Sequence, residues 1–365
     1  MILFLQYAAG GKRGGEQYTE RLHRFLLERY TRLEPVKLQP RPSEYRSIAR
    51  HARASLNMIR QLRPELVITD VSSGARNVIA INWARRNGIK VMIIIQENRM
   101  TFRFGNRAPI RWAIKTCENY LLRSADIVLS NSKYIASFVR TKARKECSII
   151  IAHPGIQIIG PTQEKFGFSS RPAEDPFRML FVGEWTEPRK GLKFLLKALA
   201  QLGDFKIQLN LAGGYSDKSP EYAQLMELIE KNNLYEIVKI HGFLNHERLP
   251  ALYSEADIFV LPSLSEGYGM ALAEAMAFGL PVVASNVAAI PEMITHNENG
   301  LLVDPKNPQA LALAIRQLIE DAQLRTRMSR ANIEKAKTLP TWADFEATLN
   351  RELVPEINRL IGLRE

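Results

Sequence analysis

Two glutamates, Glu266 and Glu274, frame a segment of this 365-residue chain whose residue types could bind a ligand. Gly267 and Gly269 stand between them, and small or helix-forming residues follow as far as Ala277. Glycines let a backbone approach a ligand closely, and the first amides of a helix attract anions because they have no acceptor within the helix. Carboxylates can accept hydrogen bonds from hydroxyls. The segment therefore predicts a site for a molecule that combines an anionic group with a polyol.

The same segment follows an apolar run at residues 258–262 and opens a helix. Its exposed first amides belong to Met270, Ala271 and Leu272. Glu274 is expected about two turns into this helix, within reach of a second polyol such as a ribose. A surface helix with a capping and a solvated glutamate is the alternative, but it gives the glycines no role.

Two further loops follow predicted strands. One ends in the adjacent cations Arg189 and Lys190, directly before an amphipathic helix, and Lys190 could neutralise a diphosphate. Solvated loop charges are the alternative for this loop. The other places Gly14 and Gly15 between the first strand and its helix, which permits close approach to a phosphate. Its spacing differs from the dinucleotide fingerprint, so this loop alone identifies no ligand.

Short apolar runs alternate with helical patterns along the whole chain. Such runs, each separated by a helix, are typical of a parallel sheet covered on both faces. The predicted strands are residues 1–8, 66–69, 91–95, 127–130, 148–152, 178–182, 206–212, 237–241, 258–262 and 281–284. They predict an α/β fold of two doubly wound, Rossmann-like domains whose parallel sheets face an interdomain cleft, with ligands at the carboxyl ends of the strands.

Domain boundaries follow from composition. Residues 155–176 are rich in glycine, proline and serine, which indicates a linker. We expect an N-terminal domain at 1–160, a C-terminal domain at 161–340, and a C-terminal helix at 341–365 that packs back across the junction. That helix has apolar residues at helical spacing, namely Trp342, Phe345, Leu349, Leu353 and Ile357.

The net charge of +12 is unevenly distributed. Residues 1–150 hold 28 lysines and arginines against 11 acidic residues, and residues 151–365 hold 22 against 27. The basic residues form two clusters, Arg46, Arg50, Arg53, Arg60 and Arg63 at helical spacing, and Arg99, Arg103, Arg107, Arg111 and Lys115 with Phe102, Phe104 and Trp112. We expect the N-terminal half to associate reversibly with an anionic membrane surface, each basic residue adding about 1 kcal/mol. No aromatic-and-glycine motif for nucleic acid is visible.

Several classes of protein are excluded by composition. Two cysteines, Cys117 and Cys147, are too few for a disulfide framework or a zinc cluster. No apolar run reaches bilayer length. The apolar start is interpreted as a buried strand and not as a signal peptide, because Lys12 and Arg13 follow it instead of preceding it. We expect a cytoplasmic protein at the inner face of the membrane.

From 177 to 338 the sequence resembles retaining family 4 glycosyltransferases, within the glycosyl transferases group 1 and the GT-B fold. The resemblance rests on residues 181–183 with 189–191, 211–214, 241–244 with 252–257, and the Glu266-to-Glu274 block with 279–284 and 300–303. The N-terminal half matches more loosely, through Gly14-Gly15 and residues 130–132.

The resemblance implies that the C-terminal domain binds a nucleoside diphosphate sugar, from which a hexose is transferred to a membrane-proximal or lipid-linked glycan in surface polysaccharide or glycolipid synthesis. It places Glu266 at the sugar, Glu274 at the ribose and Lys190 at the diphosphate. It also places Gly242 and Phe243 near the base. The resemblance also implies that configuration at the sugar is retained. No Asp-x-Asp pair occurs in the sequence, so we expect neither a metal nor another cofactor.

This sequence departs from the family pattern at two positions. Glu184 stands where the family usually has an arginine for the diphosphate, and we hypothesise that Arg189 supplies the missing charge. Gln96 follows a strand where many members have a histidine near the sugar, and His153 is a candidate substitute. A nucleotide-sugar epimerase of the same fold and a non-catalytic anion-binding module are the alternative functions.

Overall fold

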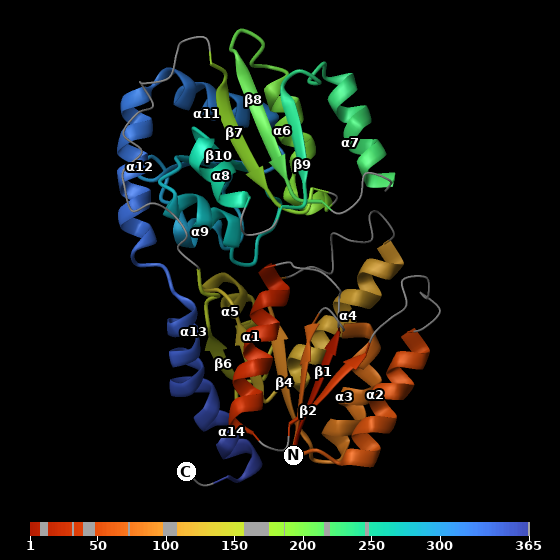
Figure 1. Ribbon diagram of the computed structural model, residues 1–365. Coiled ribbons are helices and arrows are strands. Elements are labelled where there is room, and N and C mark those ends of the chain that lie inside the picture. Colours follow the sequence, from red (N-terminus) through yellow and green to blue (C-terminus); the bar gives the residue numbers. More distant parts are fainter. Residues whose placement is uncertain are drawn as a thin grey trace. The chain divides into compact units, whose positions relative to one another are not determined.

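The computed structural model describes residues 1–7, 14–30, 33–38, 48–71, 74–97, 108–156, 175–185, 187–214, 220–244 and 248–363. The chain separates into two compact units: residues 1–155 with 340–365, and residues 156–339 (Figure 1). Each unit contains one six-stranded parallel sheet with helices on both faces. The expected α/β class with two doubly wound sheets is confirmed. No helix within these described ranges has the length and apolar character needed to cross a membrane.

The sheet of the first unit has the strand order β2-β1-β3-β4-β5-β6. Its strands are β1 (Ile2–Tyr7), β2 (Leu33–Leu38), β3 (Leu66–Asp70), β4 (Lys90–Ile95), β5 (Ile127–Ser130) and β6 (Ser148–Ile151). Its first five helices are α1 (Gly14–Arg29), α2 (Ile48–Leu62), α3 (Gly74–Arg86), α4 (Ala108–Ser124) and α5 (Lys133–Arg140). The sequence did not predict β2, because Pro35 interrupts its apolar pattern. Proline is tolerated there since β2 is an edge strand.

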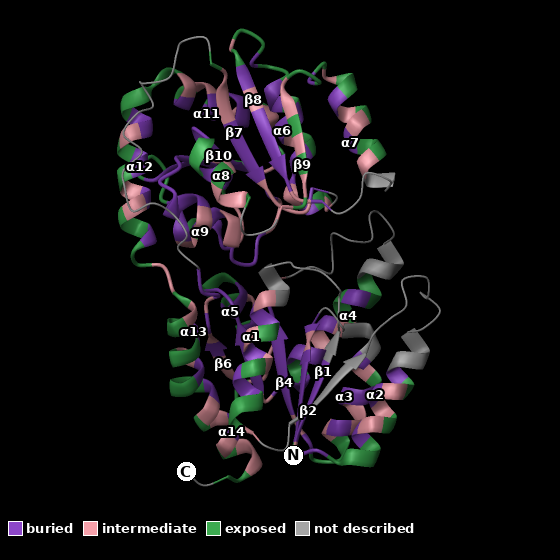
Figure 2. Ribbon diagram, in the orientation of Figure 1, coloured by how far each residue is buried: buried purple, intermediate pink, exposed green. Residues whose placement is uncertain are grey.

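The sheet of the second unit has the order β12-β11-β10-β7-β8-β9. Its strands are β7 (Phe177–Val182), β8 (Ile207–Ala212), β9 (Val238–Gly242), β10 (Ile258–Leu261), β11 (Val282–Ser285) and β12 (Gly300–Val303). Its helices are α6 (Leu192–Leu199), α7 (Pro220–Lys231), α8 (Leu249–Glu255), α9 (Met270–Ala277), α10 (Ile290–Met293), α11 (Pro308–Glu320) and α12 (Ala322–Ala336). Strands β10 and β11 are completely buried, and β8 is largely buried (Figure 2). A buried core thus supports the loops at their carboxyl ends.

The C-terminal segment is part of the first unit. Helix α13 (Trp342–Thr348), a π-helical turn (Leu349–Leu353) and α14 (Val354–Ile361) follow one another. Their buried side chains pack beside β1 and α1 in a single core cluster, as Phe345, Leu349, Leu353 and Ile357. The sequence predicts a single helix here, but a π-helical turn interrupts it just before Pro355. Proline lacks the N–H that a regular helical hydrogen bond needs.

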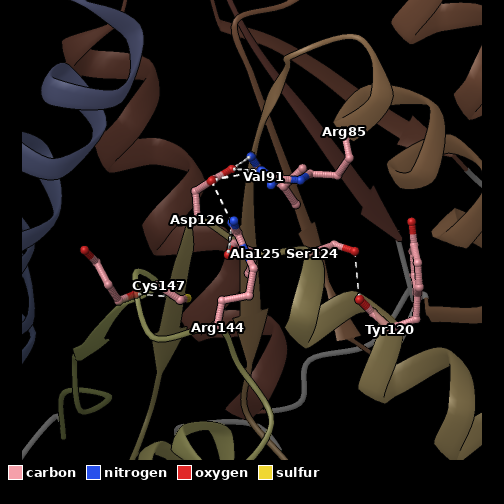
Figure 3. Close-up of polar contacts among 9 residues, drawn as sticks. Arg85, Val91, Tyr120, Ser124, Ala125, Asp126, Arg144 and Cys147 are labelled. Carbon is pink, nitrogen blue, oxygen red and sulfur yellow. Dashed lines mark hydrogen bonds and ion pairs between the residues drawn. The ribbon is translucent and has the colours of Figure 1, made fainter.

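An ion cluster fastens the amino ends of two strands in the first unit (Figure 3). Asp126, just before β5, accepts hydrogen bonds from Arg85 Nη1 at 2.8 and 2.9 Å and from Arg144 Nη2 at 2.9 Å. It also accepts one from the backbone amide of Val91, at 2.8 Å, and Arg144 donates to the carbonyl of Ala125 at 3.0 Å. These bonds connect α3, β4 and β5.

Candidate active site

Hydrogen bonds to its side chain and its backbone hold Glu266 in the loop after β10. Its side chain is 7% exposed, and its Oε2 atom accepts a hydrogen bond from Ser263 Oγ at 3.3 Å. Its backbone carbonyl accepts from the amide of Ala289 at 3.2 Å. Because both the side chain and the backbone are bonded, the carboxylate has a defined position at the carboxyl end of a central strand.

A short 3₁₀ turn (Pro188–Lys190) brings the two predicted cations to Glu266. The turn ends at Gly191, whose φ of 72° is left-handed, and a Cβ there would collide with the carbonyl of Pro262. This close packing places Lys190 Nζ 2.7 Å and Arg189 Nη1 3.8 Å from Glu266 Oε2. The structure therefore brings together residues that are 76 positions apart in the chain.

A second carboxylate completes this cluster. Glu187 Oε2 lies 2.6 Å from Arg189 Nε, and both side chains are largely buried. Burial alone would raise the pKa of Glu266, but the adjacent charges of Lys190 and Arg189 lower it below its usual range. Glu266 is therefore an ionised acceptor at neutral pH. The sequence analysis missed Glu187, although its position two residues before Arg189 was a signal.

Helix α9 begins one residue after Gly269, which has a φ of 100° and supplies the turn into the helix. The first amides of α9 are those of Met270, Ala271 and Leu272, as the sequence predicts. The expected place of Glu274 was wrong: it is the fifth residue of α9, about one turn in, because the helix starts only at Met270.

Glu274 has its own buried partner. Tyr253 Oη donates a hydrogen bond to Glu274 Oε2 at 2.8 Å. Burial raises the pKa of Glu274 to about 7, and this hydrogen bond acts in the opposite direction. The two glutamates of the block thus have opposite electrostatic environments.

The remaining predicted donor contacts lie at the same edge of the second sheet. Gly242 ends β9 with a φ of 64°, and its carbonyl accepts a hydrogen bond from the amide of Gly213 at 2.7 Å. Phe243 is 41% exposed. Trp185 Nε1 donates to the carbonyl of Gly213, so the loops after β7, β8 and β9 are bonded to one another. Sequence reasoning did not select Trp185.

The first unit contains the other candidates. Gln96 follows β4 and donates from Nε2 to Thr19 Oγ1 at 2.7 Å, and its carbonyl accepts from Asn131 Nδ2 at 2.8 Å. His153 Nδ1 lies 2.9 Å from the carbonyl of Asn131. Gln96 and His153 are therefore linked through Asn131 in one hydrogen-bonded network at the carboxyl edge of the first sheet.

Gly14 and Gly15 are the first two residues of α1. Lys12 and Arg13 lie outside the described residues, as do Arg46, Arg99, Arg103, Arg107, Phe102 and Phe104 of the two basic clusters.

Comparison with known proteins identifies the second unit. Residues 162–335 match the family model described as Glycosyl transferases group 1. The second unit is a group 1 glycosyltransferase domain. Along more of the chain, the sequence is 29% identical over 287 residues to the D-inositol 3-phosphate glycosyltransferase of Corynebacterium glutamicum, covering 74% of this chain and 68% of that protein.

Two solved structures resemble the whole chain in fold. Sucrose-phosphate synthase from Thermosynechococcus elongatus has a TM-score of 0.76 at 21% identity, with 98% of this chain and 99% of that chain covered. HepE from Anabaena in complex with UDP and glucose has a TM-score of 0.71 at 21% identity, with 96% and 98% covered. These likenesses confirm the expected GT-B fold, in which the glycosyltransferase domain holds the cluster around Glu266.

Proposed function

We propose that this glycosyltransferase transfers a hexose from a nucleoside diphosphate sugar to a glycan acceptor with retention of configuration, as family 4 enzymes do. The observation that carries the proposal is the buried pair of Lys190 and Glu266 beside the first turn of α9. It combines a cation and free helix amides for a diphosphate with a carboxylate for sugar hydroxyls. The UDP and glucose bound by HepE support a donor of this class.

In this proposal the parts of the donor are distributed along the carboxyl edge of the second sheet. Lys190, with Arg189 as the second cation, stabilises the charge that develops on the leaving diphosphate, together with the amides at the start of α9. Glu266 binds the sugar and Glu274 the ribose. Gly242 and Phe243 contact the base, the aromatic ring offering its exposed face to stacking.

The transfer needs no metal in this proposal, because Lys190, Arg189 and the helix amides supply the positive charge. The sugar–phosphate bond breaks while the acceptor hydroxyl attacks the same face, and the leaving phosphate takes the acceptor's proton.

We further propose that the first unit receives the acceptor. The network of Gln96, Asn131 and His153 offers hydrogen-bond donors and acceptors of the kind that bind sugar hydroxyls. Gly14 and Gly15, at the start of α1, would allow close approach to a phosphate. This division suits a charged donor in the second unit and a hydroxyl-rich acceptor in the first.

The proposed acceptor is lipid-linked or close to a membrane. Trp112 in the second turn of α4 is 72% exposed, and Lys115 of the same helix is exposed as well. An exposed tryptophan beside cations is typical of a protein surface that binds an anionic membrane interface. We expect flotation with vesicles of anionic phospholipid, reduced by Trp112→Ala and by high salt. Equal flotation with neutral vesicles would contradict the membrane proposal.

The donor proposal is tested by the melting temperature of the pure protein with UDP-, GDP- and ADP-sugars. A ligand at ~100-fold its dissociation constant adds roughly 2.7 kcal/mol to stability, enough to raise the melting temperature by several degrees. We expect one nucleotide class to do so, and Glu274→Ala to abolish the rise. Turnover of the sugar without an acceptor would favour an epimerase, and no rise with any of the three would favour an anion-binding module.

A further inference from the structure

Tyr253 is a buried neighbour of Glu274 to which the proposed function assigns no role. It lies in α8 and is 2% exposed. Its hydroxyl donates to Glu274 Oε2 at 2.8 Å and lies 3.3 Å from the carbonyl of Ala271. A phenol has a single hydrogen, and the shorter contact leads to a carboxylate, which makes the stronger bond. The hydroxyl is therefore attached chiefly to Glu274.

The position of that hydroxyl is fixed by the packing of its ring. The ring of Tyr253 stacks on Phe278 with centroids 5.2 Å apart and planes inclined by 17°. The ring of Phe259, in β10, is tilted by 35° against that of Tyr253, with centroids 6.1 Å apart. Phe278 directly follows α9 and Phe259 belongs to β10, so the tyrosine is held by its own helix α8, by the end of α9 and by the sheet. Its hydroxyl therefore cannot follow Glu274 if the glutamate turns away.

We propose that Tyr253 is a positioning residue of the nucleotide subsite, which holds the Glu274 carboxylate so that it receives the vicinal hydroxyls of a ribose. This inference rests on the proposed function, in which Glu274 binds the ribose of the donor. An ionised carboxylate has about four acceptor sites, so one bond from Tyr253 leaves room for both hydroxyls. The same bond lowers the pKa of Glu274 against the effect of burial, which favours the accepting form.

The arrangement makes the protein selective for ribonucleotides. A ligand without the 2′-hydroxyl leaves an acceptor site of a buried carboxylate unfilled, which weakens binding. Tyr253 does not touch the ribose in this scheme, so its removal acts only through Glu274. Loss of its hydroxyl should therefore reduce the preference for ribose over 2′-deoxyribose, and not merely weaken all ligands together.

The test is calorimetric titration of UDP, GDP and ADP, each beside its 2′-deoxy counterpart, into wild type and Tyr253→Phe. We expect wild type to prefer the ribonucleotide by roughly 10-fold or more, and Tyr253→Phe to lose most of this preference. Tyr120→Phe is the matched control, because Tyr120 also donates to one side-chain oxygen, Asn82 Oδ1, at 2.8 Å, but in the first unit. It should keep the wild-type ratio.

A second variant separates positioning from structure. In Glu274→Gln the preference should fall, and adding Tyr253→Phe should change it no further, because both act on one contact. An unchanged ratio in Tyr253→Phe, with wild type selective, would overturn the positioning role alone. If none of the three ribonucleotides binds wild type, the proposed function fails and the role of Tyr253 fails with it.

Discussion

A carboxylate lies between two cations in each unit of this chain, and we propose different roles for the two clusters. Asp126 lies between Arg85 and Arg144 just before β5, at the amino end of that strand (Figure 3). Glu266 lies beside Lys190 and the preceding arginine just after β10, at the carboxyl end. Ligands of open parallel sheets bind at the carboxyl ends of the strands. Charge composition alone therefore does not distinguish a site from a structural ion cluster.

The surroundings of the two carboxylates explain the difference. Asp126 also binds the amide of Val91, and Arg144 also binds a backbone carbonyl, so these groups tie strands together. Glu266 lies between a glycine-containing turn and the start of α9, where amides without helical acceptors gather. We therefore propose that a carboxylate–cation cluster can serve as a binding site where it adjoins such amides and loops that permit close approach.

We expect Lys190→Met to have the largest effect of the variants that test this comparison. It removes the nearest cation of Glu266 and the proposed diphosphate contact, so the rate of nucleoside diphosphate release from the sugar donor should fall roughly 100- to 1,000-fold. Arg85→Met removes a corresponding cation from Asp126 and should leave that rate within about 3-fold of wild type. Similar losses in both variants would show that the two clusters do not differ in the way proposed here.

Another buried carboxylate, Glu118 in α4, shows how burial acts on the pKa where no cation among the described residues is bonded to the carboxylate. It is 2% exposed, and its Oε1 atom has no hydrogen-bond partner in the part of the chain that the structure describes. Burial raises its pKa to about 7, and the charges of Lys115 and Lys142 only partly oppose this.

The folded protein therefore binds the proton of the Glu118 carboxyl more tightly than the unfolded chain does. Stability should fall as pH rises from about 4.5 to 7, with a loss on the order of 3 kcal/mol. We expect chemical denaturation at several pH values to show this fall in the free energy of unfolding of wild type. In Glu118→Gln the fall should be smaller by about 3 kcal/mol. A wild-type profile that Glu118→Gln does not change would contradict the assignment.

The fold could be predicted from the sequence because its signals are local. Apolar runs and helical spacing lie within a few residues of one another, and the strands they predicted recur in both sheets. The edge strand β2 was not predicted because Pro35 interrupts its apolar pattern. Glu274 lies one turn nearer the helix N-terminus than expected because α9 begins only at Met270.

The contacts of the site were less accessible to prediction. The ion pair of Lys190 with Glu266 spans 76 residues, and the hydrogen bond of Tyr253 to Glu274 spans 21. Their distances follow from strand order and from the packing of Gly191 on Pro262, which no local spacing specifies. The sequence could nominate the charged residues but not their partners.

A smaller effect is expected when the cluster of the first unit is broken. Asp126→Ala leaves two partly exposed arginines without their carboxylate and the amide of Val91 without its acceptor. The free energy of unfolding should fall by about 2 kcal/mol, since removing an acceptor leaves its donors unsatisfied. Donor affinity, measured by calorimetry on the folded variant, should stay as in wild type. A selective loss of donor affinity without loss of stability would contradict the structural role.

The smallest effect is expected from Arg144→Lys. Arg144 Nη2 bonds both Asp126 and the carbonyl of Ala125, at 2.9 and 3.0 Å, and a lysine ammonium can retain the charge but not the planar geometry of these two bonds. Because the arginine side chain is 36% exposed, solvent screens much of its charge. Unfolding free energy should therefore fall by less than about 1 kcal/mol. A loss as large as that of Asp126→Ala would mean that the planar guanidinium, and not the carboxylate, organises this cluster, because the charge itself is the same in both side chains.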